Sequence, residues 1–417
     1  MSEIAGPAAI ALASLCPDDV NFLRSLPKAE LHAHLNGSIP IKTILELAQQ
    51  YSPPSSAQAI ENKAIADTID KLKSGVSLNE ISDFFLLFPA IYALTSTPKA
   101  VTIATRAVLQ SFLNPAGDGV EQPQCTYLEL RTTPRCTTHM MRETYLSAVL
   151  DEVEMYPATK AALIVSIDRR MGDSDIEECI NLAIELKNRG RRVVGIDVCG
   201  DPRSGNMKLF TDHILRAKGA GLGLTVHIAE TTENTVDDCL TLLGWRPDRL
   251  GHATFLSDEL KAFVFADIPQ PGDYDSLPDC TPSATNTHAV RNPYPSRHAR
   301  IQLRAAIEAI EEVLKEGGPP DRWDRKGRYQ PCIEICLSSN LLCKTVASLD
   351  AHHIRYYLKN DHPIVICTDD TLPFRTSCLG EYALLLAQPP LGLGLSRDDV
   401  ARVAQMGMDA AFLRPRD

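Results

Sequence analysis

The chain has 417 residues, of which 44% are hydrophobic and 23% are charged, a balance typical of a globular protein with a large core. Its formal net charge of −11 argues against broad electrostatic binding to nucleic acids or to anionic membranes. We therefore expect neither as a partner, and an anionic small molecule would need a local group of basic residues.

Residues 1–24 are predicted to form an N-terminal tail. The stretch Met1–Leu15 is rich in Ala but lacks the basic segment and the long apolar core of a signal peptide, so a frayed tail is the better interpretation. The twelve cysteines include no Cys-x-x-Cys pair, and no apolar run approaches the length of a membrane span. These features predict a cytoplasmic protein in a reducing compartment, without a cysteine zinc site.

Short β-rich runs alternate with amphipathic helical patterns along the chain, and most of these runs are continuously apolar. Such runs are typical of parallel strands that are covered on both faces. Eight of them, separated by helices, predict a single α/β domain over residues 25–417, a TIM-type (β/α)8 barrel. The predicted strands are Ala29–Leu35, Cys125–Arg131, Ala161–Asp168, Arg192–Gly200, Gly221–Glu230, Arg249–Phe255, Cys332–Ser339 and Pro363–Asp370.

Two stretches exceed a minimal barrel. Residues 51–97, after the first strand, carry apolar side chains at helical spacing from Phe84 to Tyr92 and predict a helical cap that packs on the barrel. A lid over the pocket is the alternative, because loops after barrel strands build active sites. Residues 268–330, after the sixth strand, predict a flexible Pro-rich loop over 268–295 followed by a charged helix over 299–317.

Ionisable residues follow several of the predicted strands, where a barrel places its active site. His32 and His34 are one residue apart, so on a strand both imidazoles point to the same face. His227 would supply a third nitrogen ligand and Asp369 an oxygen ligand, which leaves an open position for water. This set predicts a catalytic zinc site, although the same ligands also suit iron or cobalt.

Three further ionisable residues lie at the same strand ends. Glu230 follows His227 by three residues and is placed to exchange protons with the substrate. His252, if it is not a ligand, would orient the hydroxide. Asp370 points away from Asp369 if the strand continues, so we expect it to hold the substrate.

The motifs that carry these residues resemble the adenosine deaminase superfamily of amidohydrolases. They are Pro27-Lys-Ala-Glu-Leu-His-Ala-His-Leu-Asn-Gly-Ser, Gly200-Asp-Pro, His227-Ile-Ala-Glu, Leu250-Gly-His-Ala-Thr and Cys367-Thr-Asp-Asp. The resemblance implies one zinc ion on His32, His34, His227 and Asp369, with Glu230 as the proton donor and His252 beside the hydroxide. It also implies that Gly200 and Asp370 contact purine ring nitrogens and that His34 borders the substrate. The implied reaction is hydrolytic removal of the amino substituent at purine C6.

Within the superfamily the chain is most similar to the adenosine deaminase-like branch, which converts N6-methyl-AMP to IMP and methylamine. The resemblance implies substrate contacts from Asn36, from the loop that contains Thr132, Thr133, Pro134 and Arg135, and from Asp168. Independently, two hydroxyls and a guanidinium on one loop suit a phosphate monoester, and Arg169 and Arg170 would add positive potential. Tyr92 stands where animal relatives carry a His, and a phenol can still donate a hydrogen bond there.

Three alternatives stay open at this point. An adenosine or adenine deaminase would use the same zinc chemistry without a phosphate site. A catalytically inactive purine-binding protein would not need Glu230 beside a metal. A two-metal hydrolase would need a bridging lysine, but the fourth strand ends Asp197-Val-Cys-Gly200 without one. We expect the protein to act as a monomer on a small purine nucleotide.

Overall fold

A computed structural model describes residues 4–51, 58–74, 76, 78, 81–115, 122–257, 260–261 and 330–412. The loop predicted over 268–295 and the helix predicted over 299–317 lie outside these described residues.

Eight parallel strands form one sheet whose order follows the chain from β1 to β8. Almost every strand residue is buried, which confirms the expectation from the continuously apolar runs that both faces are covered. The strands are β1 (Ala29–Glu30), β2 (Tyr127–Thr132), β3 (Ala161–Asp168), β4 (Val193–Cys199), β5 (Gly223–Ile228), β6 (Arg249–His252), β7 (Cys332–Ile335) and β8 (Ile364–Ile366). The predicted TIM-type barrel is confirmed, and each predicted strand matches one of these eight.

The barrel is nearly closed where the first strand segment meets the last. The backbone N–H of His34 donates to the carbonyl oxygen of Asp369 at 3.1 Å. The buried carboxylate of Glu30 accepts from the N–H groups of His32 and Thr368, both at 2.9 Å. The seam therefore brings the His-x-His segment next to the Asp-Asp segment.

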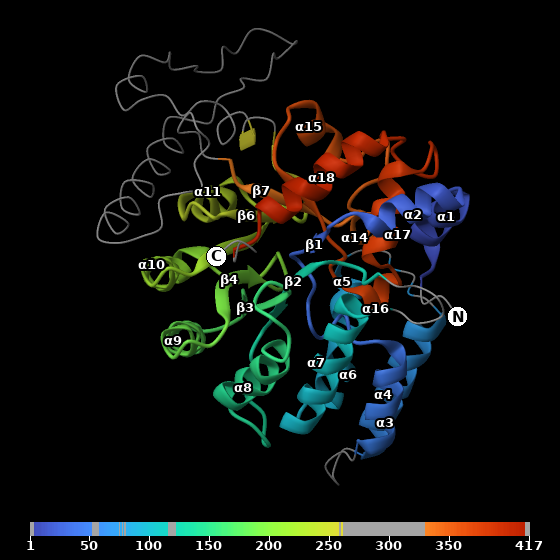
Figure 1. Ribbon diagram of the computed structural model, residues 1–417. Coiled ribbons are helices and arrows are strands. Elements are labelled where there is room, and N and C mark those ends of the chain that lie inside the picture. The colour runs from blue at the N-terminus through green and yellow to red at the C-terminus, as the bar shows by residue number, and fades with distance from the viewer. Residues whose placement is uncertain are drawn as a thin grey trace, which may run out of the picture.

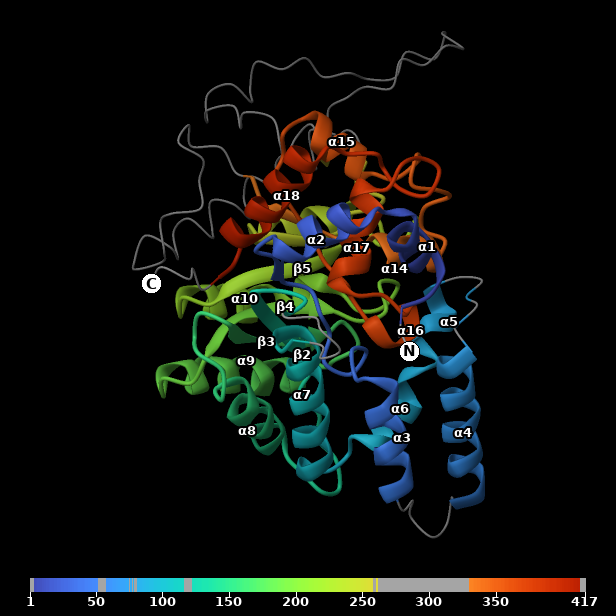
Figure 2. The ribbon, with the colours of Figure 1, turned by 45° about the vertical axis from the view of Figure 1, so that its right-hand side comes forward.

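Helices surround the sheet, as Figures 1 and 2 show. Helices α7, α8, α9 and α11 lie against the strands from β2 to β5, and α17 and α18 lie against β8. Apart from the helices of the insertion after the first strand, the described helices between the strands are α3 (Ile41–Gln50), α7 (Pro98–Leu113), α8 (Arg142–Val153), α9 (Asp173–Asn188), the 3-10 helix η1 (Met207–Phe210), α10 (Thr211–Gly219), α11 (Val236–Gly244), α14 (Leu337–Leu342) and α15 (Ile354–Lys359). Three helices follow β8: α16 (Thr371–Phe374), α17 (Cys378–Leu386) and α18 (Arg397–Asp409).

The N-terminal segment is helical, where the sequence predicts a frayed tail. It forms α1 (Gly6–Ser14) and α2 (Pro17–Ser25), and both pack against α17. Ala8 is buried so close to Gly380 of α17 that a Cβ on the glycine would lie 3.0 Å from the Ala8 Cβ. Helices this short are marginal in isolation, so their order comes from tertiary packing, which local sequence patterns do not reveal.

The segment after the first strand is helical, as the sequence predicts for residues 51–97. It forms α4 (Gln58–Ser74), α5 (Ile81–Phe85) and α6 (Phe88–Leu94), which lie together with α3 and α7 at one side of the barrel (Figure 2). Phe84 of α5 stacks on Phe374 of α16, with ring centroids 5.2 Å apart. The insertion is thus packed directly against the segment that follows Asp370.

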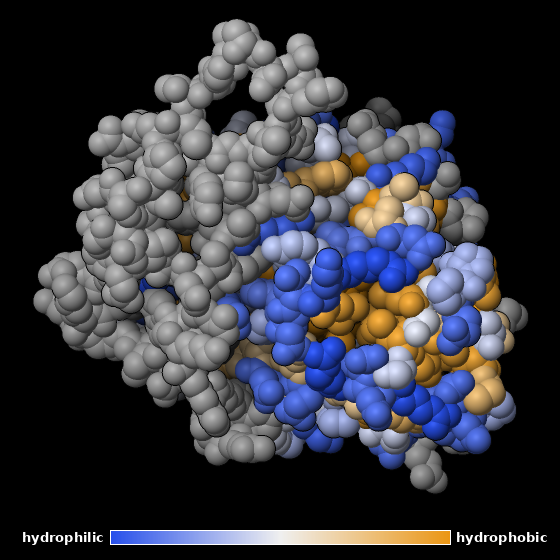
Figure 3. Space-filling view, turned by 90° about the horizontal axis from the view of Figure 1, so that it is seen from above, coloured by the Kyte–Doolittle hydropathy of each residue, from blue (hydrophilic) through white to orange (hydrophobic). Residues whose placement is uncertain are grey.

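The surface combines polar and apolar areas. Figure 3 shows the molecule of Figure 1 from above, and on this face hydrophilic residues border an apolar area. Among the described residues, no helix is both long enough and apolar enough to span a membrane.

Candidate active site

A cavity of about 290 Å³ lies at the carboxyl ends of the barrel strands. Its floor consists of side chains from the strand ends, and its mouth is bordered by the insertion helices and by the loops after β2, β3 and β4. The cavity is lined by His34, Leu35, Asn36, Phe84, Phe85, Phe88, Pro89, Tyr92, Arg131, Thr132, Thr133, Asp168, Arg170, Cys199, Gly200, His227, Glu230, His252, Asp369 and Asp370. Most of the predicted site residues therefore meet in one place.

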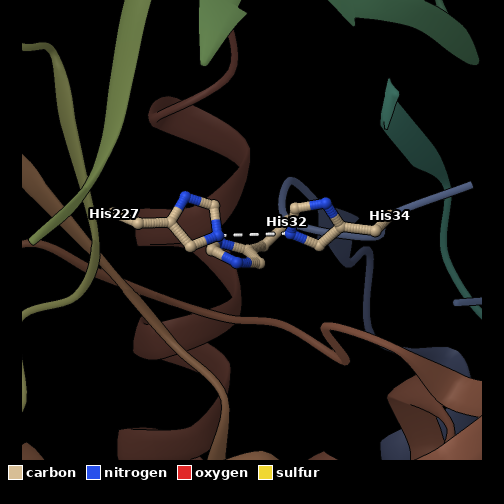
Figure 4. Close-up of side chains that lie close together, drawn as sticks. All are labelled: His32, His34 and His227. Atoms are coloured by element: carbon tan, nitrogen blue, oxygen red, sulfur yellow. Dashed lines mark hydrogen bonds between the residues drawn. The ribbon is translucent and has the colours of Figure 1, made fainter. Parts of the chain in front are cut away.

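Three histidines converge at the floor (Figure 4). His32 and His34 follow β1, whereas His227 lies in β5, and the Nε2 atoms of His34 and His227 are 3.2 Å apart. An Asp369 carboxylate oxygen lies 3.6 Å from the Nε2 atoms of both His32 and His34. Atoms that bind one zinc ion at 2.0–2.1 Å lie roughly 3–3.5 Å from their neighbours. The separations of 3.2 and 3.6 Å are close to this range, so these four residues are near enough to one another to hold a single zinc ion.

The protonation of these histidines also suits a metal. His32 Nδ1 lies 2.5 Å from Glu334, and His227 Nδ1 lies 3.0 Å from Asp197, so in both rings Nδ1 carries a hydrogen towards a carboxylate and Nε2 faces the centre. Burial alone would lower the pKa of His227, but the Asp197 carboxylate raises it above the usual value for histidine. Burial lowers the pKa of His32 and His34 well below the usual value for histidine, which keeps both rings neutral. The buried Nε2 of His32 makes no hydrogen bond. A lone pair in that position fits the nitrogen donor that zinc requires.

Glu230 and His252 lie beside the histidine centre. Their carboxylate oxygen and Nε2 are 3.6 Å apart, and burial raises the pKa of Glu230 to about 7. His252 and Asp369 both adopt left-handed backbone conformations, with φ of 59° and 61°. Non-glycine residues seldom adopt this conformation, and such strain concentrates at functional sites.

The side chain of Asp370 lines the cavity and occupies the space that a side chain at Gly37 would fill. A Cβ at Gly37 would lie 1.4 Å from an Asp370 carboxylate oxygen, so glycine is needed at this position. Burial and the neighbouring Asp369 carboxylate raise the pKa of Asp370 well above its ordinary value. Its Oδ1 is buried without a hydrogen-bond partner, as expected for a group that meets a substrate.

At the mouth, Asp168 at the end of β3 packs against Gly200. Gly200 has φ of 100°, and a Cβ there would lie 2.6 Å from an Asp168 oxygen. The Asp168 carboxylate accepts hydrogen bonds at 2.8 Å from the backbone N–H and from the Nε of Arg170. Arg170 lines the cavity with its side chain half exposed, whereas Arg169 is buried and ion-paired with Asp238.

Asn36 and Thr132 both line the cavity, and the hydroxyl group of Tyr145 links them by hydrogen bonds. Tyr145 of α8 makes a 2.7 Å bond with the Thr132 hydroxyl and donates to Asn36 Oδ1 at 3.3 Å. Thr133 lies beside Cys199, with 3.8 Å between its hydroxyl and the thiol. The Thr132 hydroxyl thus already has a hydrogen-bond partner in the protein. Tyr145 holds the side chains of Thr132 and Asn36 in place, and the sequence motifs did not indicate this role.

Pro134 and Arg135 are not among the residues that line the cavity. The Arg135 guanidinium donates to the carbonyl oxygens of Tyr92 and Thr95, at 3.0 and 3.1 Å, and lies 4.4 Å from the Tyr92 ring centroid. A cation that binds the last carbonyl groups of a helix stabilises that helix end. Arg135 therefore anchors α6, which carries Tyr92 into the cavity wall.

The comparisons with known proteins agree with this geometry. A family model described as adenosine deaminase matches residues 27–268 and 321–417. The chain belongs to the adenosine deaminase family. The matched segments leave out residues 269–320, within the stretch for which the sequence predicts an insertion.

Individual family members span nearly the whole chain. The N6-methyl-AMP deaminase of Bos taurus is 31% identical over 376 residues, covering 88% of this chain and 86% of the relative. A crystal structure of the Arabidopsis N6-mAMP deaminase is 28% identical, with a TM-score of 0.66, and covers 94% of this chain and 95% of that one. An Arabidopsis structure complexed with IMP is also 28% identical, with a TM-score of 0.66 and 94% coverage of both chains.

Three charged residues next to the histidine centre are not among the site residues that the sequence motifs predict. Arg131, Asp197 and Glu334 are fully buried in the barrel interior, and the two carboxylates hold His227 and His32. Asp197 and Glu334 each stand inside an otherwise apolar strand, and Arg131 shares the buried strand β2 with Glu129. A charged residue in such a run is seldom buried unless it is paired, so this pattern could have identified them from the sequence.

Proposed function

We propose that the protein is a hydrolytic deaminase that converts N6-methyl-AMP to IMP and methylamine. The proposal depends mainly on one observation: a single cavity combines the histidine centre and Glu230 at its floor with the cationic side chain of Arg170 at its mouth. The relatives named N6-methyl-AMP deaminase support the same substrate.

We further propose that His32, His34, His227 and Asp369 hold one zinc ion. When bound, zinc would act as a Lewis acid that makes hydroxide available from water near neutral pH. The separations of the donor atoms and the unpartnered Nε2 of His32 support this assignment. The donor set alone does not distinguish zinc from iron or cobalt, so the metal content of the purified protein must be measured.

Glu230 is the proposed proton donor. Because burial raises its pKa to about 7, a large fraction of this carboxyl group is protonated near neutral pH, and the protonated form can deliver its proton to the purine ring. His252 would orient the attacking water. Asp370 and the backbone of Gly200 would contact ring nitrogens, which places C6 and its substituent towards the floor.

We assign recognition of the phosphate to Arg170 and the Thr132–Thr133 loop. Arg170 is a cation that lines the mouth of the cavity, and it has the forked donor geometry that suits a phosphate. Asp168, which Arg170 now holds, would be available to the ribose. Arg135 can reach the substrate only by giving up its hydrogen bonds to α6, so we expect it to act mainly through Tyr92.

The test is to incubate zinc-loaded protein with N6-methyl-AMP, AMP, N6-methyladenosine and adenosine, and to follow the products by chromatography. The proposal predicts IMP from N6-methyl-AMP with little turnover of either nucleoside. Inosine from adenosine as the dominant product would assign the chain to nucleoside deamination with the same zinc chemistry. No turnover with metal bound would favour a purine-binding protein.

A cytoplasmic location and a monomeric state remain predictions. Cell fractionation would test the first, and size-exclusion chromatography with light scattering would test the second.

A further inference from the structure

We propose that Glu334 and Asp197 are positioning residues for the metal site and that Arg131 holds both in place, so that one buried arginine couples ligands from opposite sides of the barrel. The inference assumes the metal site of the proposed function, but not the identity of its substrate. None of the three residues is among the predicted metal ligands: the two acids act through histidines, and Arg131 acts through the two acids.

Glu334, in the middle of β7, fixes His32. One carboxylate oxygen lies 2.5 Å from His32 Nδ1, while the other accepts from the Thr225 hydroxyl at 3.0 Å and from Arg249 Nε at 2.7 Å. With both oxygens engaged, the carboxylate cannot rotate. Because His32 is fully buried, the imidazole is locked in one orientation with Nε2 towards the centre.

Asp197, in the middle of β4, does the same for His227. Its Oδ1 lies 3.0 Å from His227 Nδ1, and its Oδ2 accepts from the Ser166 hydroxyl at 2.9 Å. Two ligands on non-adjacent strands are thus held by the same arrangement, a carboxylate on Nδ1 with a hydroxyl on the other oxygen. Partners of this kind commonly set the orientation and basicity of metal-binding histidines.

Arg131 lies between the two carboxylates. Its Nη2 donates to both oxygens of Glu334 at 2.9 Å and to the carbonyl oxygen of Leu31, and its Nη1 lies 3.4 Å from Asp197. An unpaired carboxylate in this buried interior would be very costly, so both acids need a cation. Because one planar guanidinium serves both, a displacement of Glu334 is felt at Asp197.

A matched control exists in the same cluster. Glu129 of β2 is also fully buried and ion-paired with Arg249, but it binds Tyr127 and the backbone of Phe412. Glu129→Gln and Glu334→Gln each remove one negative charge from the same buried cluster. Any difference in zinc affinity between them therefore reports the contact with His32 rather than charge or general destabilisation.

The experiment measures the zinc affinity of folded, metal-stripped protein by competition with a chromophoric chelator, together with thermal unfolding of each apo form. We expect Glu334→Gln and Asp197→Asn to weaken zinc binding about 10- to 100-fold, and Glu129→Gln to leave it within about twofold of wild type. Arg131→Lys keeps the positive charge but loses the planar guanidinium that contacts both carboxylates. We therefore expect it to weaken zinc binding more than Glu129→Gln does and less than Glu334→Gln does.

Milder variants guard against misfolding. Thr225→Val and Ser166→Ala each remove one hydroxyl that supports Glu334 or Asp197, with little change in volume. Both should weaken zinc binding measurably, relative to Glu129→Gln, if orientation is what matters. If Thr225→Val and Ser166→Ala bind zinc as tightly as Glu129→Gln does, the inference is overturned, while the proposed function stays intact. Failure of the wild-type protein to bind zinc would overturn both.

Discussion

The floor and the mouth of the cavity hold their charges in different ways. At the floor, Glu334 and Asp197 are fully buried and share Arg131, so each charged group has fixed partners. At the mouth, Asp168 is held by the half-exposed Arg170, and Arg135 is engaged with α6. The contrast indicates that the floor is preorganised for chemistry, whereas the mouth can exchange protein contacts for substrate contacts.

The largest expected effect is at the floor, from Glu230→Gln. An amide of nearly the same shape cannot deliver the proton, so kcat for N6-methyl-AMP should fall about 10²- to 10⁴-fold. Zinc content, measured by atomic spectroscopy, should stay at the wild-type level because Glu230 is not among the proposed ligands. A variant that retained more than a tenth of the activity would exclude Glu230 as the proton donor.

Two arginines keep the buried carboxylate of Glu334 ionised, and Glu381 of α17 shows the opposite case. Burial alone would raise the pKa of Glu334, but Arg131 and Arg249 lower it overall. Glu381 is fully buried and bonded by Ser338 and Thr376, and burial raises its pKa from an ordinary value of 4.5 to about 7. Glu381 therefore favours the folded state only while it is protonated.

This difference predicts a pH dependence for Glu381→Gln. The stabilisation from a raised carboxyl pKa is fully present below pH 4.5 and is lost as the pH rises through 7. Between those values the wild type should lose about 3 kcal/mol of unfolding free energy relative to the variant. Urea unfolding at pH 5, 6, 7 and 8 would measure it, and a pH-independent difference between the two proteins would contradict it.

At the mouth, Arg170→Gln tests recognition of the phosphate. A charge-assisted contact of a half-exposed arginine is at the weak end of its range, so KM for N6-methyl-AMP should rise about tenfold. KM for N6-methyladenosine, if that nucleoside is turned over, should not change. Arg203→Gln is the matched control, because Arg203 pairs in the same i, i+2 manner with Asp201 but does not line the cavity. Equal effects of the two variants would remove Arg170 from the phosphate site.

The sequence predicted which ionisable residues meet at the floor, but neither the buried charges that support them nor the contacts at the mouth, for physical reasons. Strand ends of a barrel must converge, so His32, His227 and Asp369 could be placed together from their positions alone. The role of Arg135 could not be predicted, because it depends on where α6 lies, and tertiary packing sets that. The helices α1 and α2 were missed for the same reason, since their order depends on contact with α17.

The smallest expected effect is that of Arg135→Ala, which tests whether Arg135 holds α6 in place or binds the phosphate of the substrate. Arg135→Ala removes hydrogen bonds to the end of α6 and the contact with the Tyr92 ring, which should lower the unfolding free energy by about 1–2 kcal/mol. If Arg135 acts by anchoring α6, kcat/KM should fall by the same factor for N6-methyl-AMP and for N6-methyladenosine.

Tyr92→Phe is the control for that anchoring, since it keeps the ring against which Arg135 packs and should leave stability within about 0.5 kcal/mol of wild type. A loss confined to the nucleotide in Arg135→Ala would instead show that Arg135 reaches the phosphate when substrate binds. In that case Arg135 gives up its hydrogen bonds to the end of α6 when the nucleotide binds. Steady-state kinetics on the two substrates therefore decides whether Arg135 stays on α6 or moves to the phosphate.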